Sequence, residues 1–374
     1  MMDLSKAFDC LNHELLLAKL HTYGFKKASL DLIHNYLTNR KQRVKVNGSF
    51  STYSDVRQGV PQGSVLGPLL FNIYINDMFM GLTDTEVCNY ADDTTLYACN
   101  KSLQNVVNSL DRDTQRIITW FPDNYMKLNE EKCHLMTFSA SSTDTSIHVG
   151  KAQIKESSEE KLLGVTLDKH LTFKPHVSTL CKKANQKIHG LARISKYMET
   201  EKIVLLMKTF IMSQFNYCPL VWMFHDRNLN NKINKMHLRA LRIAYRDYES
   251  DFETLLKRDN SVTVHQRNLQ LLMVEIYKTK VNLNPEFMKD IFVTNDVPYS
   301  LRSGNGLLQP SARTTNFGIE TTPFIGHKLW QTLPNEIKTA SSLAVFKNRI
   351  KSWKGERCNC RLCRIFIPNL GFLI

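Results

Sequence analysis

The sequence predicts an α+β fold, in which strands and helices alternate up to residue 170 and helices dominate the rest. Short apolar segments bounded by turn residues recur as far as Asp168, as is typical of strands. From Lys174 onward, apolar residues recur instead at helical spacing. With 374 residues, 43% of them hydrophobic and 22% charged, the chain is long and apolar enough for two or three globular domains.

In the first part, leucines at helical spacing predict two amphipathic helices, and the dipeptide Asn47-Gly48, favoured in tight turns, predicts a hairpin. The apolar run Leu69–Ile75 predicts a further helix, which Ser64 can cap. The elements expected before this run are a strand at Met1–Lys6, helices at Glu14–Tyr23 and Leu30–Leu37, and strands at Gln42–Val46 and Phe50–Val56.

The rest of the chain is expected to contain a second hairpin around Tyr90–Asp93, a long helix, more strands and then a helical region. A stretch rich in Pro, Gly, Ser, Thr and Asn interrupts this region and indicates a linker. The aromatic side chains after the linker are expected to pack against the preceding helices rather than to stack on bases. The expected elements are a helix at Leu103–Tyr125, strands within Leu135–Asp168, helices at His176–Ile194, Glu201–Phe224, Leu229–Tyr245 and Val264–Val281, the linker at Asn282–Phe324, helices at Gly326–Lys338 and Ser342–Trp353, and the aromatic residues Phe324, Trp330, Phe346 and Trp353.

Two adjacent carboxylates, Asp92 and Asp93, stand at the turn of the second hairpin. Like charges held side by side repel each other, so such a pair usually has a cation to bind. Asp3 follows a short apolar entry and could face the hairpin from a neighbouring strand. Three carboxylates suit two Mg²⁺ ions roughly 3.5–4 Å apart, the arrangement used for phosphoryl transfer. The alternative is a solvated acidic turn.

The order of further segments removes this ambiguity. The chain resembles the reverse transcriptase of non-LTR (LINE-type, jockey-like) retrotransposons over nearly its whole length. The segments that carry the resemblance are Met1–Asp9, Asp55–Pro68, Tyr90–Asp93, Trp120–Phe138 with Asn129 and Lys132, Leu162–Asp168, Tyr217–Trp222, and Leu329–Pro334 with Phe346-Lys347.

The resemblance implies an RNA-directed DNA polymerase that transfers deoxynucleotides onto a primer 3′-hydroxyl with two Mg²⁺ ions, or Mn²⁺ in their place. Asp3 and Asp92 would bind both ions, and Asp93 would support the site. Lys132 would lie near the departing pyrophosphate, where an ammonium can neutralise charge or donate a proton. A solvated surface lysine is the alternative reading of Lys132.

The same resemblance implies the substrate contacts. Phe8 would stand against the 2′-hydroxyl of the incoming nucleotide, with a core phenylalanine as the alternative, and Gln62 and Gly63 would touch the nascent base pair and template. Gly63 would be needed for close backbone approach. The remaining contacts are the backbone of Ser5, Lys6 and Ala7 around the triphosphate, as in a nest, and Leu163, Gly164 and Val165 as the primer grip. Asp9 and His13 belong to the first motif, and we expect Asp9 to cap the helix that starts near Asn12.

The resemblance also implies the domains: residues 1–170 as a right-hand polymerase palm, 171–282 as a helical thumb, 283–325 as a linker or extended wrap, and 326–374 as a helical C-terminal region with a cysteine-containing tail. Only Met1 and Met2 precede Asp3, so we expect the fingers and endonuclease regions to be missing here and supplied by a longer chain. Asp3 is expected to fray, since terminal residues are often poorly ordered.

The net charge of +14 and the pI of about 9.3 favour a polyanionic partner, here an RNA template and a DNA primer. Basic residues concentrate on the helices expected for the thumb. No signal peptide is visible, and the longest apolar run, near Val65–Ile75, is too short to span a membrane. We therefore expect an intracellular protein, nuclear or cytoplasmic, without a membrane partner. The basic residues on the helices expected for the thumb are Lys182, Lys183, Lys187, Arg193, Lys196, Lys202, Lys208, Arg239, Arg242 and Arg246.

Most of the nine cysteines are scattered, as expected of reduced thiols. Cys358, Cys360 and Cys363 form a cluster that could be half of a zinc knuckle. No histidine follows them, and His327 lies far back in the sequence, so a fourth ligand is missing and we expect free thiols in a loose basic tail.

Two other functions share these motifs. One is a catalytically silent remnant that binds nucleic acid through its basic helices. The other is a domesticated interaction protein that uses the palm fold as a scaffold.

Overall fold

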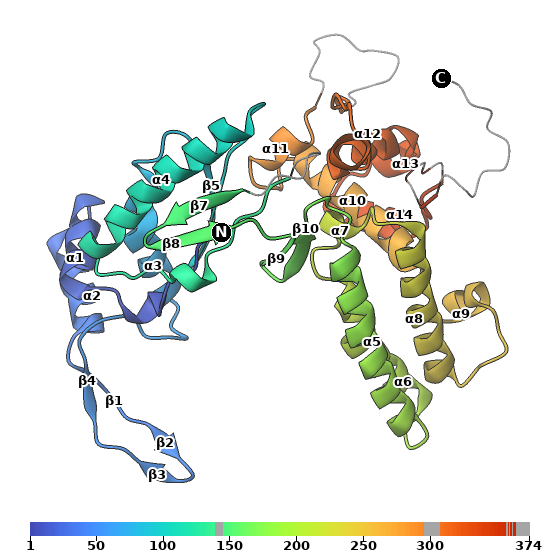
Figure 1. The fold of residues 1–374 in the computed structure, drawn as a ribbon. Helices are drawn as coiled ribbons and strands as arrows, with labels where there is room; N and C mark the ends of the chain where they lie inside the picture. Colours follow the sequence, from blue (N-terminus) through green and yellow to red (C-terminus); the bar gives the residue numbers. More distant parts are fainter. Residues whose placement is uncertain (139–144, 295–306, 357, 359, 361, 364–374) are drawn as a thin grey trace. The chain divides into compact units, whose positions relative to one another are not determined.

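The computed structural model describes residues 1–138, 145–294, 307–356, 358, 360 and 362–363 (Figure 1). The chain divides into two compact units, Met1–Leu163 and Gly164–Ile374. Helices and small antiparallel ladders alternate in the first unit, and helices dominate the second. This confirms the α+β class. Within the described residues, no helix combines the length and the apolar character that a membrane crossing needs.

The helices of the first unit enclose its apolar core. Asn12 caps the first of them, because its side chain accepts a hydrogen bond from the Leu15 amide at 2.9 Å. Leu16, Leu20 and Phe71 are fully buried in this core, together with Ile117. The elements are the 3₁₀ turn η1 (Ala7–Asp9), α1 (His13–Thr22), α2 (Lys27–Leu37), α3 (Gly67–Ile75), the 3₁₀ turn η2 (Asn76–Phe79), α4 (Leu103–Asp123) and the 3₁₀ turn η3 (Glu130–Lys132).

The named strands of the first unit pair in antiparallel hairpins. Asn47 and Gly48 both have positive φ, 47° and 87°, which confirms the predicted tight turn between Val46 and Ser49. Short exposed strands around this turn form a long blue hairpin in Figure 1. The antiparallel pairs are β1 (Arg40–Gln42) with β4 (Ser54–Val56), β2 (Lys45–Val46) with β3 (Ser49–Phe50), β5 (Glu86–Tyr90) with β6 (Asp93–Tyr97), and β7 (Ser146–Val149) with β8 (Ala152–Lys155). The unit ends in β9 (Glu159–Leu162).

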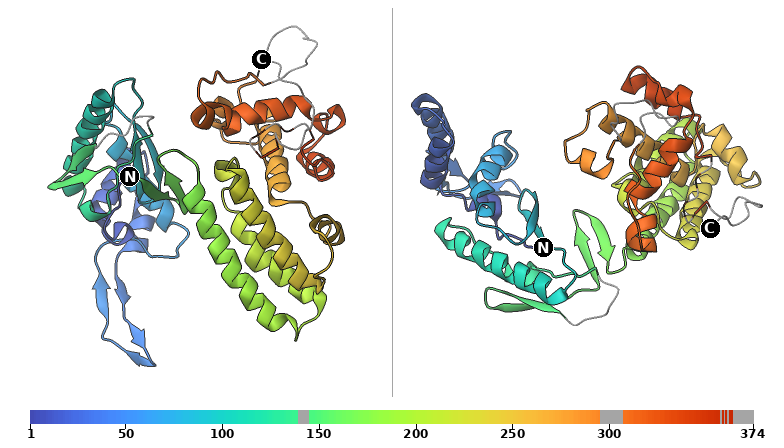
Figure 2. Two further views of the ribbon diagram at one scale, coloured as in Figure 1. Left: turned by 45° about the vertical axis from the view of Figure 1, so that its right-hand side comes forward. Right: turned by 90° about the horizontal axis from the view of Figure 1, so that it is seen from above.

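The second unit opens with β10 (Val165–Asp168) and two long helices, α5 (Lys174–Ser195) and α8 (Arg227–Tyr245), which lie side by side as the green and yellow helices of Figure 2. Apolar side chains between them and α6 (Thr200–Leu206) form one core, which includes Ile188, Ile203 and Leu241. α9 (Phe252–Arg258), which the sequence did not predict, also packs against α8.

A single helix over Glu201–Phe224 was wrong. After α6 the backbone passes through the π-helix η4 (Met207–Ile211) and the 3₁₀ turn η5 (Met212–Phe215), and α7 (Pro219–Trp222) is separate. Cys218 has a φ of 43°, and Pro219 cannot donate a helical hydrogen bond, so the helix cannot continue through these residues.

A second core surrounds α10 (Val264–Lys280), and Tyr277 on this helix stacks on Phe346 at 4.2 Å between ring centroids. Phe324, Trp330 and Trp353 are also buried, which confirms that these aromatic rings pack inside the protein. The predicted helix Gly326–Lys338 is interrupted before Pro334. The helices around α10 are α11 (Met288–Ile291), the π-helix η6 (Thr315–Ile319), α12 (Thr322–Thr332), α13 (Asn335–Lys338) and α14 (Leu343–Ile350). Residues 295–306 of the predicted linker lie outside the described residues.

Candidate active site

Asp92 and Asp93 lie at the tip of the β5–β6 hairpin. Tyr90 pairs with Asp93, so Ala91 and Asp92 form a two-residue connection. Ala91 has a φ of 54°, a left-handed conformation that costs a non-glycine residue roughly 1–2 kcal/mol. Asn89 supports the turn, because its side-chain amide donates to the Ala91 carbonyl at 3.0 Å and to the Thr94 hydroxyl at 2.9 Å.

Asp3 is held beside this hairpin. Met2 and Thr94 exchange two backbone hydrogen bonds, 2.7 and 3.3 Å long, so antiparallel register sets Asp3 opposite Asp93. On its other side, the Asp3 carbonyl accepts a hydrogen bond from the Asn129 amide at 3.0 Å. The expectation that Asp3 frays was therefore wrong, because the segment is hydrogen-bonded to neighbours on both sides.

The carboxylates act on one another electrostatically. Burial, followed by the negative charges of Asp92 and Asp3, raises the pKa of Asp93 above its ordinary value. Lys132 forms an ion pair with Asp3, with 3.2 Å between its Nζ atom and Asp3 Oδ2. The Lys132 side chain is 63% exposed and that of Asp3 27%, so this ion pair contributes little to stability. The ion pair nevertheless places the Lys132 ammonium beside the carboxylate of Asp3.

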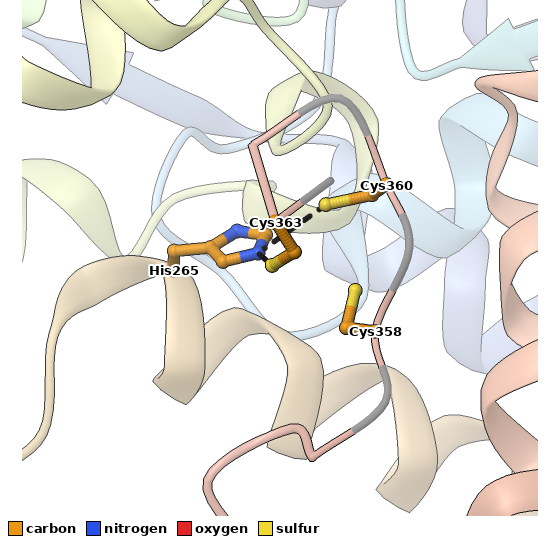
Figure 3. A group of neighbouring side chains, drawn as sticks. All are labelled: His265, Cys358, Cys360 and Cys363. Carbon is orange, nitrogen blue, oxygen red and sulfur yellow. Dashed lines mark hydrogen bonds between the residues drawn. The ribbon is translucent and has the colours of Figure 1, made fainter. Parts of the chain in front are cut away.

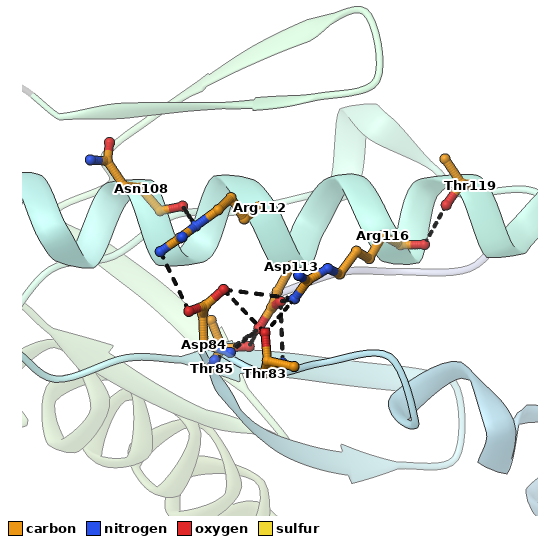
Figure 4. A network of polar contacts seen from close by, with 8 residues as sticks. All are labelled: Thr83, Asp84, Thr85, Asn108, Arg112, Asp113, Arg116 and Thr119. Carbon is orange, nitrogen blue, oxygen red and sulfur yellow. Dashed lines mark hydrogen bonds and ion pairs between the residues drawn. The ribbon is translucent and has the colours of Figure 1, made fainter.

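Asp113, a buried aspartate on α4, binds the residues that lead into the β5–β6 hairpin (Figure 4). Asp113 is fully buried and accepts hydrogen bonds from the Asp84 amide at 3.0 Å and from the amide and hydroxyl of Thr85, both at 2.8 Å. Arg116 completes its shell at 2.6 Å. Burial alone would raise the pKa of Asp113, but these hydrogen bonds outweigh burial and hold the pKa below its ordinary value.

Sequence reasoning missed Asp113. Its only signal was an aspartate in the middle of an amphipathic helix, a pattern that usually marks the solvent face. The partners are backbone amides of a loop, and no sequence pattern indicates them.

The chain turns sharply after Asp3. Lys6 has a φ of 51° and its carbonyl accepts a hydrogen bond from the Asp9 amide at 2.9 Å. Such turns can direct successive amides towards one point. The Ser5 amide already donates to the Lys127 carbonyl at 3.0 Å, so the amides of Lys6 and Ala7 are the candidates for a phosphate contact.

Phe8 stacks on Phe71 of α3, with 4.4 Å between ring centroids. Phe71 is fully buried, whereas Phe8 is only partly buried. Phe8 therefore belongs to the rim of the core and still presents part of its ring.

The loop before α3 is fastened to the first motif by side chains. Gln62 Nε2 donates to Asp9 Oδ1 at 3.0 Å, and His13 Nε2 lies 2.8 Å from the Gly59 carbonyl oxygen. The expectation that Asp9 caps the following helix was wrong, because Asn12 provides that cap. Asp9 instead binds Gln62, the residue that the family resemblance places at the nascent base pair.

Two residues of this loop have local roles in its conformation. Gly63 has a φ of 78° and open space around it, so the left-handed backbone explains the glycine. Ser64 Oγ accepts the Gly67 amide at 3.0 Å and donates to the Pro61 carbonyl at 2.6 Å. Ser64 thus contacts the first residue of α3, but the N-cap position is Leu66, which has no side-chain cap bond, so the prediction of Ser64 as the cap was wrong.

Leu163 and Gly164 form the turn at which the two units meet along the chain, with φ values of 44° and 86°. Two positive values in succession are the signature of a type I′ turn. A Cβ atom at Gly164 would lie 3.3 Å from the Tyr217 ring, and Val165 is buried. The turn is thus compact, as a hairpin that positions another group would need to be.

Comparison with known proteins shows where the similarity lies. The family described as reverse transcriptase (RNA-dependent DNA polymerase) matches residues 1–167. The chain is 26% identical over 292 residues to the RNA-directed DNA polymerase from mobile element jockey of Drosophila melanogaster, covering 73% of this chain and 32% of that protein.

Two further relatives agree. The probable RNA-directed DNA polymerase from transposon BS of Drosophila melanogaster is 26% identical over 64% of this chain and 28% of its own length. The Pol polyprotein from the type-1 retrotransposable element R2 of Popillia japonica is 30% identical over 35% of this chain and 23% of its own length. The chain therefore spans about a third or less of these relatives. Residues 1–167 therefore match the reverse transcriptase family, and the relatives to which the chain is similar are polymerases and a Pol polyprotein of mobile elements.

Proposed function

We propose that this chain is the RNA-directed DNA polymerase module of a non-LTR retrotransposon, which adds deoxynucleotides to a primer 3′-hydroxyl along an RNA template. The observation that carries the proposal is the meeting of Asp3 with the Asp92-Asp93 turn through the paired Met2 and Thr94. Asp92 and, from a distant segment, Asp3 both act electrostatically on Asp93, and such like charges are costly for folding and useful for binding cations.

The donor set fits Mg²⁺, with Mn²⁺ as a substitute. Its groups are all carboxylate oxygens, which hard divalent cations prefer. Burial, and after it the charges of Asp92 and Asp3, raises the pKa of Asp93, and a bound cation would oppose both effects. Asp3 and Asp92 would hold the ions and Asp93 would support them. When bound, the ions activate the attacking hydroxyl and neutralise charge on the phosphates.

The surrounding residues take the substrate roles. The amides of Lys6 and Ala7 would bind the triphosphate, and Lys132 would neutralise the departing pyrophosphate from its place beside Asp3. Phe8, rigid because it stacks on Phe71, would exclude a 2′-hydroxyl. Gln62, held by Asp9, and Gly63 would contact the base pair and template.

The first unit would serve as the palm, and the helices α5, α6 and α8 of the second unit as the thumb. Leu163, Gly164 and Val165 would position the primer end. Residues 283–325 would be a wrap between the thumb and the C-terminal helices 326–374.

The basic residues of the second unit divide into two groups. Lys208 pairs with the buried Asp259 at 3.0 Å, and Arg246 donates to the Ser195 carbonyl at 2.8 Å, so both have structural partners. By contrast, Lys183 and Lys187 are exposed one turn apart on α5, and no ion pair found among the described residues involves them. These two lysines are the better candidates for contacts with the nucleic-acid backbone.

Single-nucleotide incorporation tests the proposal. The chain is given an RNA template, a DNA primer, a complementary dNTP and Mg²⁺, and Asp92→Asn is compared with Asp31→Asn, which alters an exposed aspartate on α2. We expect incorporation by the wild type and by Asp31→Asn, and a loss of at least about 100-fold in Asp92→Asn. Incorporation that persists in Asp92→Asn would overturn the assignment.

A further inference from the structure

Four side chains of residue types that can bind a metal lie together in the second unit, and none of them has a role in the proposed polymerase chemistry (Figure 3). Cys358, Cys360 and Cys363 come from the segment after α14, and His265 comes from the first turn of α10. Their ligand atoms all lie within 4.8 Å of one another. His265 supplies the fourth ligand that sequence reasoning found missing.

The distances from the imidazole to two of the sulfurs are at or slightly below those of a tetrahedral zinc site, and no two ligand atoms are more than 4.8 Å apart. His265 Nε2 lies 3.3 Å from Cys363 Sγ and 3.5 Å from Cys360 Sγ. Bonds of about 2.3 Å from zinc to sulfur and 2.0–2.1 Å to nitrogen place neighbouring ligand atoms roughly 3.5–3.8 Å apart in a tetrahedron. Small side-chain rotations are enough to reach that geometry.

The three cysteines are free thiols, as expected, but Cys358 and Cys360 are buried, so the expectation of a loose segment was wrong for them. Residues 364–374 of the predicted tail lie outside the described residues. Cys358 and Cys360 are 3% and 1% exposed, and His265 is 8% exposed. The Cys363 amide donates to the Cys360 carbonyl at 2.9 Å, which folds the two cysteines into one tight turn. A closed site built from protein ligands alone is typical of structural metals, whereas catalytic sites keep an open position.

The chain that leads to the cysteines is fastened to α10 before it reaches them. Gln270 donates to the carbonyls of Lys351 and Trp353, at 3.2 and 2.7 Å. Gly355 passes so close to Leu269 that an added Cβ atom would stand 2.5 Å from its Cδ1 atom. The approach of the cysteines to His265 therefore follows from packing that does not depend on a metal.

We propose that His265, Cys358, Cys360 and Cys363 form a structural zinc site that fixes the C-terminal segment to the start of α10. Three thiolates favour a soft or borderline cation, and a fourth imidazole ligand completes the Cys₃His set that zinc adopts in structural sites. Binding of Zn²⁺ releases the protons of the three thiols, and ligation through Nε2 leaves the imidazole proton on Nδ1.

The metal would close a loop between ligands 95 residues apart, measured from His265 to Cys360. That loop contains α12, α13 and α14, whose apolar faces complete the core around α10. Zinc removal is therefore expected to loosen these helices without acting on Asp3, Asp92 or Asp93 in the other unit.

The metal content of the purified full chain tests the proposal. Elemental analysis should find one zinc per chain in the wild type and in Cys99→Ser, which changes an exposed cysteine of the first unit. Cys360→Ser and His265→Ala should each lose the metal, and His265→Cys should retain it as a four-thiolate site. A wild-type chain without zinc when prepared in zinc-containing buffer, or full zinc in Cys360→Ser, would overturn the proposal.

Two measurements on the wild type keep the test independent of how the variants fold. X-ray absorption at the zinc edge should give three sulfur neighbours at about 2.3 Å and one nitrogen at about 2.0 Å. A shell of oxygen and nitrogen alone would contradict the site. Cobalt substitution should produce thiolate-to-metal charge-transfer bands. A disulfide between two of these cysteines, detected by mass spectrometry without reduction, would exclude the proposed site.

Discussion

Gly59 lies so close to Asp9 that a Cβ atom added to it would stand 2.8 Å from the Asp9 Cα atom. The Gly59 amide donates to the Leu11 carbonyl at 2.8 Å, and the Gly59 carbonyl oxygen lies 2.8 Å from His13 Nε2. The loop that carries Gln62 is thus fixed by its backbone against the first motif, and only glycine leaves room for that contact.

Gly59→Ala is expected to destabilise the first unit by about 2–5 kcal/mol, since a positive φ costs roughly 1–2 kcal/mol and overpacking against backbone roughly 1–3 kcal/mol more. Gly63, in the same loop, has a similar φ of 78° but open space around it. Gly63→Ala should therefore cost only the roughly 1–2 kcal/mol of the positive φ. Urea unfolding of both variants gives the comparison. Equal losses in the two variants would contradict the close approach at Gly59.

Asp113→Asn is expected to destabilise the first unit by about 2–4 kcal/mol, because a buried carboxylate is lost while Arg116 and the loop amides remain. Hydrogen exchange should increase in residues 83–97. The pKa of Asp113 is lowered on folding, so its contribution is present at neutral pH and is lost as the pH falls below about 4 through the lowered value. Asp123→Asn, an exposed change on the same helix, should leave exchange in these residues unaltered.

Asp93→Asn is expected to raise the melting temperature at pH 7 while removing activity. The pKa of Asp93 is raised in the folded chain, so folding favours its neutral form and stability falls as the pH rises through that pKa. The gain should therefore shrink as the pH falls through that raised pKa and the wild-type carboxyl becomes protonated. Added Mg²⁺ should stabilise the wild type more than the variant. A lower melting temperature for Asp93→Asn at pH 7 would contradict the repulsion described for this cluster.

Lys183→Ala and Lys187→Ala are expected to weaken binding to a template–primer duplex and to reduce the slope of log K against log salt by about 1 each. Lys208→Ala is the matched control, because Asp259 already neutralises Lys208. Fluorescence anisotropy at several salt concentrations measures the slopes. A slope that changes only in Lys208→Ala would exclude α5 as the contact surface.

Patterns that are local in sequence predicted the local structure well. Asn47-Gly48 specifies its own turn, and leucines at helical spacing specify α1 and α2 through the faces they bury. The single helix expected over Glu201–Phe224 failed because spacing does not reveal a change to π and 3₁₀ geometry. The break at Pro219 follows from the sequence itself, because proline has no amide hydrogen to donate within a helix.

Contacts between distant segments were predicted mainly where a known motif order supplied them. Asp3 was expected beside the hairpin from its place after a short apolar entry and then from the family resemblance, and the Met2–Thr94 pairing is consistent with both. No family motif pointed to Asp113 or to His265, whose partners lie on a loop and on a segment 95 residues away. Tertiary packing alone brings these groups together, so their roles became visible only in the folded chain.

The most direct test of the carboxylate site is the broadening of NMR signals by paramagnetic Mn²⁺, measured on the full chain in zinc-containing buffer. Because this measurement detects weak binding, it does not depend on polymerase activity. Signals of Asp3 and of residues 92–94 should broaden first, and Asp92→Asn should abolish that broadening. If Mn²⁺ broadens other acidic segments and leaves Asp3 and Asp92 sharp, the three carboxylates do not form a cation site and the proposed chemistry is wrong.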